Sequence, residues 1–237
     1  MATRRAAEAI ARAIELDIIA ADLPPGAMIG SEAELIERYG VSRGVIREAV
    51  TLVESHMLAE TRRGIGGGLV VAEPDASVVE DIVSLFLARK KATEHELHEV
   101  RIALEVLALR KVMANLDDHA RTVLRDELAY EPSATEDMTA ASQRFHLALA
   151  ELSGNKVLQL FVPTTTALVE EMWTNPEPMT RKQRRDLWTT VSSCHAEIIQ
   201  AMLTGRTEFA VALLQVHLEQ VADAIEVNRQ VQVSPLD

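Results

Sequence analysis

Two arginines four positions apart, Arg43 and Arg47, are the first side chains with an evident chemistry. On a helix they lie within roughly 40° of each other. Ser42 is a good N-cap, and Gly44 lets the helix start approach a surface closely, where free amides attract phosphate. Arginine forks also bind guanine edges. The segment therefore predicts a DNA-contacting helix; the alternative is a solvated face paired with acids such as Glu48.

Three histidines form the second candidate group, His146, His195 and His217, and each falls in a different expected helix. Three imidazoles that converge inside a helical bundle can bind zinc or a similar divalent ion. The alternative is three hydrogen-bonded core residues, because spacing alone does not show convergence.

Arg101 is a candidate anchor for an anionic effector, since its planar fork matches a carboxylate. The same side chain can instead form an i,i+4 ion pair with Glu105. His98 and His119 are expected to face solvent, and we assign them no role.

The elements that position Arg43 and Arg47 can be read from their caps. Ser31 to Glu34 has the form of a capping box, and Gly40 can end that helix in a left-handed conformation. Only Val41 then precedes Ser42 and the next helix, whose inward stripe is Ile46, Ala49, Val50 and Val53. Two short helices joined by a tight turn predict a helix-turn-helix.

A hairpin should follow, with strands at 58–62 and 69–72 and a glycine-rich tip at 63–68. Helix-turn-helix and hairpin together make a winged helix. Arg62, Arg63 and Gly64 would place a second cationic point against DNA.

After Pro74 the pattern is helical throughout. Thr93 with Glu96 forms another capping box, Asp117 and Thr135 are N-caps, and Gly154 and Gly205 are stops. We expect helices at 77–90, 94–115, 118–130, 136–153, 155–173, 180–204 and 207–230. The predicted fold is therefore mainly α, with a winged helix-turn-helix at 1–74 and an all-α helical bundle at 75–237.

Composition narrows the function class. The 237 residues carry a net charge of −12, which excludes a wholly basic nucleic-acid binder and requires a local basic cluster. The single cysteine, Cys194, excludes an internal disulfide. No stretch is apolar enough to cross a membrane, so we expect a cytoplasmic protein without a membrane partner.

The first 74 residues resemble the N-terminal domain of GntR-type bacterial transcription regulators. The resemblance rests on Leu23 to Gly26, Ser31 to Leu35 and Val41 to Val50. It implies a homodimer on a double-stranded DNA operator, with contacts from Arg43, Arg47 and the wing near Gly64. The family often has arginine where this chain has Ala33, and its usual proline after the Pro-Gly turn is also absent.

The rest of the chain resembles the FadR-type subfamily and its FCD effector domain. The resemblance is carried by Phe145-His146, Ser153 to Asn155, His195 with Ile198-Ile199, Gly205, His217, and Val100-Arg101 with Leu104-Glu105. It implies a metal on His146, His195 and His217, but the family's aspartate ligand is replaced by Ser142. Either a water or a carboxylate effector completes a zinc site, or a metal-free pocket binds the effector directly. The expected effector-binding residues are Arg101, Ser142, His146, His195 and His217.

We therefore expect a ligand-responsive transcription regulator, a repressor, that binds a small organic acid or acyl effector. Two alternatives stay open at this point. One is a metal-dependent hydrolase that uses the three histidines, although no general acid or base is evident. The other is a dimerisation module whose histidines only pack.

Overall fold

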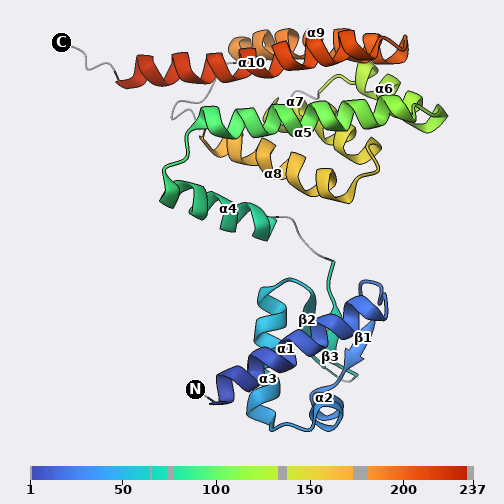
Figure 1. The fold of residues 1–237 in the computed structure, drawn as a ribbon, viewed down its shortest axis with the longest axis vertical. Helices are drawn as coiled ribbons and strands as arrows, with labels where there is room; N and C mark the ends of the chain where they lie inside the picture. Colours follow the sequence, from blue (N-terminus) through green and yellow to red (C-terminus); the bar gives the residue numbers. More distant parts are fainter. Residues whose placement is uncertain (1, 65, 74–76, 133–137, 173–180, 234–237) are drawn as a thin grey trace. The chain divides into compact units, whose positions relative to one another are not determined.

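The computed structural model describes residues 2–64, 66–73, 77–132, 138–172 and 181–233. The chain forms two compact units, Met1–Val78 and Val79–Asp237, and each is described by itself. Helices dominate both units (Figure 1). The predicted boundary between residues 74 and 75 lies outside the described residues.

The first unit has the predicted helix-turn-helix. Its elements are α1 (Ala2–Ala20), β1 (Met28–Gly30), α2 (Glu32–Tyr39), α3 (Arg43–Ser55), β2 (Ala59–Arg62) and β3 (Gly68–Val71). Ser31 caps α2: its Oγ accepts from the Glu34 amide at 3.3 Å, and the Glu34 carboxylate accepts from the Ser31 amide at 2.7 Å. Gly40 ends α2 with φ of 64°, as predicted.

The sheet is larger than the predicted hairpin. β2 and β3 pair antiparallel as expected, but β1 pairs with the other edge of β3, so the strand order is β1-β3-β2. Met28 to Gly30 was not predicted as a strand, because three residues are too few for an alternating pattern.

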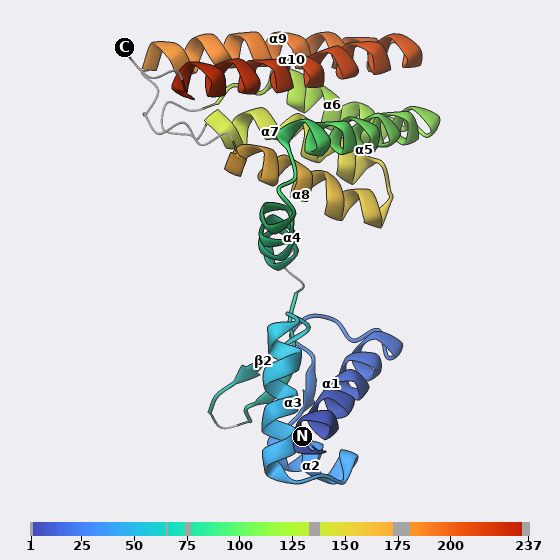
Figure 2. The same cartoon turned by 60° about the vertical axis from the view of Figure 1, so that its left-hand side comes forward.

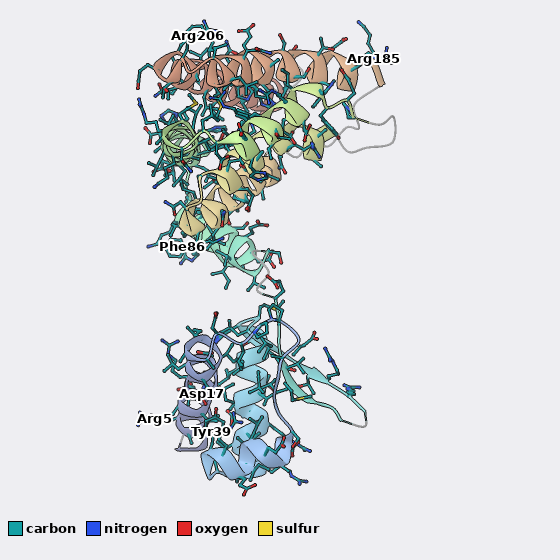
Figure 3. All side chains as sticks on the ribbon, turned by 90° about the vertical axis from the view of Figure 1, so that its right-hand side faces the viewer. Arg5, Asp17, Tyr39, Phe86, Arg185 and Arg206 are labelled. Atoms are coloured by element: carbon teal, nitrogen blue, oxygen red, sulfur yellow. The ribbon has the colours of Figure 1, made fainter. Side chains whose placement is uncertain are left out.

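α1 packs against α3 and covers the core of the first unit (Figure 2). Ile14, Leu35, Ile46 and Val53 are 1% exposed or less. The Tyr39 hydroxyl of α2 donates to Asp17 Oδ2 of α1 at 2.7 Å (Figure 3). Burial and the Asp17 carboxylate raise the pKa of Tyr39 to about 12. These contacts fix α3 against the other two helices.

The described part of the second unit contains the predicted helices and no strand. They are α4 (Ser77–Lys90), α5 (Glu94–Ala114), α6 (Asp118–Ala129), α7 (Met138–Leu152), α8 (Lys156–Met172), α9 (Arg181–Leu203) and α10 (Thr207–Val233). Thr93 with Glu96 caps α5, and Asp117 caps α6. Gly154 and Gly205, with φ of 63° and 75°, follow α7 and α9. The predicted cap Thr135 lies outside the described residues.

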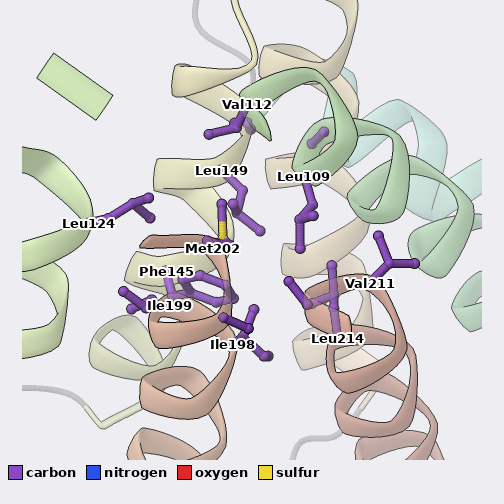
Figure 4. Packing of buried hydrophobic residues seen from close by; sticks show 14 of the residues in the cluster. Leu109, Val112, Leu124, Phe145, Leu149, Ile198, Ile199, Met202, Val211 and Leu214 are labelled. Atoms are coloured by element: carbon purple, nitrogen blue, oxygen red, sulfur yellow. The ribbon is translucent and has the colours of Figure 1, made fainter. Parts of the chain in front are cut away.

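The core of the second unit is formed by buried side chains of α5 to α10 (Figure 4). It is aliphatic apart from one aromatic ring, and the side chains drawn there include Leu109, Val112, Phe145, Leu149, Ile198, Ile199, Met202, Val211 and Leu214. Among the described residues, no helix is long and apolar enough to span a membrane.

Candidate functional site

The start of α3 exposes the predicted arginine pair. Ser42 occupies the N-cap position, although its hydroxyl makes no capping hydrogen bond. The side chains of Arg43 and Arg47 are 70% and 67% exposed. A Cβ on Gly44 would meet nothing within 4 Å, so packing inside the protein does not require a glycine there. The small residue is consistent with a surface that approaches an outside partner.

The acid beside the arginines differs from the one expected. Arg43 Nε lies 2.9 Å from Glu32 Oε1, and Arg47 Nε lies 3.1 Å from Glu32 Oε2. Glu48 forms no such pair with either arginine within the described residues. Glu32 belongs to the first turn of α2, and only the folded turn between the helices brings it to α3. Helical spacing within α3 could not have revealed it.

The wing carries the other predicted cationic point. Arg62 ends β2, and Arg62, Arg63 and Gly64 are all exposed. Gly64 has φ of 107°, a conformation that side chains disfavour. A Cβ on Gly67 would lie 2.3 Å from the Arg62 carbonyl oxygen, so the tip turns too tightly for a side chain there. The backbone of the wing tip therefore favours glycine at positions 64 and 67.

The three histidines of the second unit do converge. His146 of α7, His195 of α9 and His217 of α10 are 3%, 6% and 5% exposed. One nitrogen from each lies within 4.8 Å of the others. His195 Nε2 and His217 Nε2 are 3.1 Å apart, so without a metal one of them must donate to the other.

A buried ion pair adjoins this histidine cluster. Arg101 Nε donates to Glu105 Oε1 at 2.7 Å, and the other oxygen of Glu105 contacts His146 Nδ1. Both α5 side chains are buried, Glu105 completely. The i,i+4 pair of Arg101 therefore exists, but it uses Nε and leaves the terminal amino groups for another acceptor. The role of Glu105 in orienting His146 was not foreseen.

Electrostatics favour the neutral, metal-binding form of His195 and His217. Burial and the positive charge of neighbouring groups lower the pKa of His217 to about 3, and that of His195 well below its usual range. Burial alone would raise the pKa of Glu105, but His146 and Arg101 overcome it and lower that pKa to about 2. Near neutral pH the neutral imidazoles of His195 and His217 thus lie close to the Glu105 carboxylate anion.

His98 corrects a prediction. It was expected to face solvent, as His119 does, but His98 is 2% exposed. It shares the inward face of α5 with Arg101 and Glu105, at i, i+3 and i+7. Within the described part of the chain, neither ring nitrogen has a hydrogen-bond partner, nor does the buried Thr166 hydroxyl of α8. Burial, together with the Arg101 charge, lowers the pKa of His98 to about 4.

A cavity of about 310 Å³ adjoins the histidine cluster on the side of α6 and α9. His195 and Phe145 line its inner wall, and Tyr130 and Trp188 meet edge to face in it with ring centroids 6.0 Å apart. Its size suits a small ligand. Ser142 is half-buried one turn before His146, where the resemblance implies a ligand.

Comparison with known proteins assigns both units. Residues 6–68 match the family described as bacterial regulatory proteins, gntR family, and residues 96–220 match the FCD domain. The chain belongs to the FCD-domain regulators of the gntR family. It is therefore a DNA-binding transcription regulator, and neither this family nor the relatives below are enzymes, which argues against the hydrolase alternative.

The relatives of this gntR-family chain match along most of its length. LutR of Bacillus subtilis is 28% identical over 86% of this chain and 94% of its own. The Uxu operon transcriptional regulator of Escherichia coli is 27% identical over 86% and 80%. A putative L-lactate dehydrogenase operon regulatory protein of Escherichia coli is 27% identical over 92% and 85%. The solved GntR of Streptococcus agalactiae shares the fold, with a TM-score of 0.64, 20% identity and coverage of 92% and 99%.

The residues of this FCD domain fit a divalent metal by their chemistry. A metal needs neutral imidazoles, and the lowered pKa values of His195 and His217 provide them. The Glu105 contact to His146 Nδ1 leaves Nε2 as the ligand atom, a common arrangement around zinc.

Proposed function

We propose that the protein is a ligand-responsive repressor that binds a two-fold operator as a homodimer in the cytoplasm. Arg43, Gly44 and Arg47 would enter the major groove from the N-cap at Ser42. The wing residues Arg62, Arg63 and Gly64 would contact the adjacent backbone or groove. The observation that carries the DNA half is the exposed arginine pair at the start of α3 in a gntR-family domain.

We propose further that the histidine cluster holds zinc or a similar divalent ion and that a small organic or acyl acid binds beside it. His146, His195 and His217 would be the protein ligands, and Ser142 contributes no charge. When bound, the metal supplies a Lewis acid for a carboxylate. The terminal amino groups of Arg101 would receive the same anion. The supporting observation is the convergence of three buried imidazoles within 4.8 Å next to Arg101.

Recovery of sheared source-genome DNA on the purified protein tests the DNA half. The proposal predicts a few sharp peaks that share a short palindrome, because a symmetric dimer selects two-fold sites. Diffuse enrichment that disappears with salt would contradict specific operator binding. A fragment bearing the palindrome is then the operator probe for later titrations.

Metal titration tests the effector half. We expect Zn²⁺ to raise the Tm of protein stripped with a chelator, since a ligand that binds only the folded state stabilises it. His195→Ala should abolish the rise. His119→Ala, which removes an exposed histidine of α6, is the matched control and should keep it. An equal rise in both variants would place the metal elsewhere.

Once the metal is established, candidate effectors can be screened on the zinc-loaded protein. L-Lactate is a reasonable first probe, because one relative is named for an L-lactate dehydrogenase operon. We expect a carboxylate effector to raise the Tm of the zinc-loaded protein further and to change its operator affinity. If no metal and no acid of a carboxylate panel shifts the Tm, the result favours a dimerisation module whose histidines only pack.

A further inference from the structure

Among the described residues, Glu32 is the one acid that pairs with both arginines at the start of α3. Its two carboxylate oxygens lie 2.9 and 3.1 Å from Arg43 Nε and Arg47 Nε. The residue is held at the first position of α2 by the reciprocal cap between Ser31 and Glu34. Glu32 is therefore part of a fixed turn, whereas the arginine side chains are long and two-thirds exposed or more.

The choice of nitrogen decides what the arginines can still do. Both contacts use Nε, so each guanidinium keeps the four N–H groups of Nη1 and Nη2. These terminal groups form the fork that binds guanine O6 and N7. One carboxylate thus restrains two side chains without using the donors that read a base.

We propose that Glu32 is a positioning residue for sequence reading: it holds Arg43 and Arg47 with their terminal forks available as a pair to the DNA bases. This inference rests on the proposed role of the two arginines. Restraining the side chains before binding lowers the entropy cost of the specific complex. Non-specific contact with phosphates does not need a fixed fork, and there a carboxylate is unfavourable because it repels DNA.

The two effects separate in a binding measurement. A site is first selected from a random-sequence duplex pool with the unchanged protein. The Kd is then measured for the selected duplex and for a scrambled duplex of equal length. For Glu32→Gln we expect tighter binding of the scrambled duplex and weaker binding of the selected one. The ratio between them should fall about tenfold, which equals about 1.4 kcal/mol.

Glu32→Asp separates geometry from charge. It keeps the negative charge but is one methylene shorter and cannot bridge both Nε atoms in the same way. We expect its scrambled-duplex Kd to stay unchanged while the ratio still falls. Glu37→Gln is the matched control, since it removes an exposed carboxylate from the same helix, and it should leave the ratio unchanged.

The outcomes distinguish this inference from the proposed function. If Glu32→Gln changes the Kd values for the selected and the scrambled duplex by the same factor, as Glu37→Gln does, Glu32 is only a surface charge and the inference is wrong. If the unchanged protein selects no common site, the assigned arginine reading fails first, and the inference fails with it.

Discussion

Arg47 tests the recognition surface at the scale of one residue. We expect Arg47→Ala to raise the Kd for the selected duplex about fivefold or more, because an arginine–base contact is worth about 1–3 kcal/mol. Its ion pair with Glu32 lies on the surface, and such pairs contribute only about 0–1 kcal/mol to stability. A fluorescence anisotropy titration measures the Kd, and circular dichroism should show an unchanged helix content.

Arg5→Ala is the control for Arg47→Ala. It removes the same charge from α1, where Arg5 is exposed (Figure 3), and leaves α3 untouched. Its Kd should stay within about twofold, because charges at a distance are largely screened at moderate salt. Equal losses in both variants would show that the protein responds to total charge and not to this helix.

His98 offers a stability prediction at the same scale. Its buried imidazole lacks hydrogen-bond partners among the residues that the structure describes, and an unsatisfied polar group costs about 1–3 kcal/mol. We expect His98→Leu to raise the free energy of unfolding at pH 7.5. Urea titration followed by tryptophan fluorescence is suitable, because both tryptophans belong to the second unit. A clear loss of stability would mean that a water or ligand satisfies the ring.

The stabilisation by His98→Leu should depend on pH. The folded pKa of His98 is lowered to about 4, by burial and then by the Arg101 charge, against the partial opposition of Glu105. The unfolded pKa is about 6.5. At a pH between 6.5 and 4, His98 therefore takes up a proton in the unfolded chain and stays neutral in the folded protein. The unchanged protein should therefore lose stability as pH falls through this window, by at most about 1.4 kcal/mol per unit from this group.

The advantage of His98→Leu should thus grow from pH 7.5 to pH 5. Other histidines titrate in both proteins, so their contributions cancel in the difference. A difference that stays constant over this range would contradict the low folded pKa of His98.

Single residues were predictable only where chemistry and spacing agree. The three histidines stood out because each lies in its own helix. The burial of His98 and the contact of Glu105 with His146 were not predicted, because α5 carries apolar side chains on its outer face: Val100 and Leu107 are 51% and 44% exposed. Apolar periodicity therefore did not show which side of α5 faces the core. Glu32 depends on a turn between two helices, which no pattern within one element shows.

At the scale of elements, Gly44 tests whether α3 approaches DNA closely. Gly44→Ala should raise the stability of the first unit by about 0.5–1 kcal/mol, since alanine is the better helix former and its Cβ meets no protein atom. We nevertheless expect operator binding to weaken severalfold, because the added methyl lies beside Arg43 and Arg47 at the exposed start of α3. Calorimetry and the duplex titration measure the two effects.

Gly40→Ala is the opposite control. Gly40 has φ of 64° at the end of α2, where a side chain costs about 1–2 kcal/mol. This variant should be less stable. Its operator affinity, measured at a temperature well below its Tm, should be unchanged. If Gly44→Ala keeps its affinity as well, α3 does not approach DNA at that position.

Helix positions were predictable because local signals mark their ends. The capping boxes at Ser31 and Thr93 and the glycines after α2, α7 and α9 lie in the sequence itself. β1 was missed because a three-residue strand is stabilised by pairing with β3 and has no pattern of its own. Local chemistry therefore predicts where helices start and stop, whereas short strands depend on tertiary pairing.

At the scale of the whole molecule, the net charge of −12 means that DNA binding depends on a local surface. An effector site in the second unit changes that binding only if the effector prefers one state of the protein. The coupling is then reciprocal: an acid that changes operator affinity by some factor must have its own affinity changed by the same factor when operator is bound.

This reciprocity supplies the last prediction. Suppose that an acid raises the operator Kd about tenfold in the zinc-loaded protein, within the usual 5–150-fold range of coupling. Calorimetric titration of the same acid into protein saturated with operator should then give a Kd about tenfold higher than without DNA. His195→Ala, which lacks a metal ligand, should lose both changes together. Complete loss of acid binding at saturating operator would show that the acid competes with DNA at the DNA surface itself, and the second unit would not be the sensor.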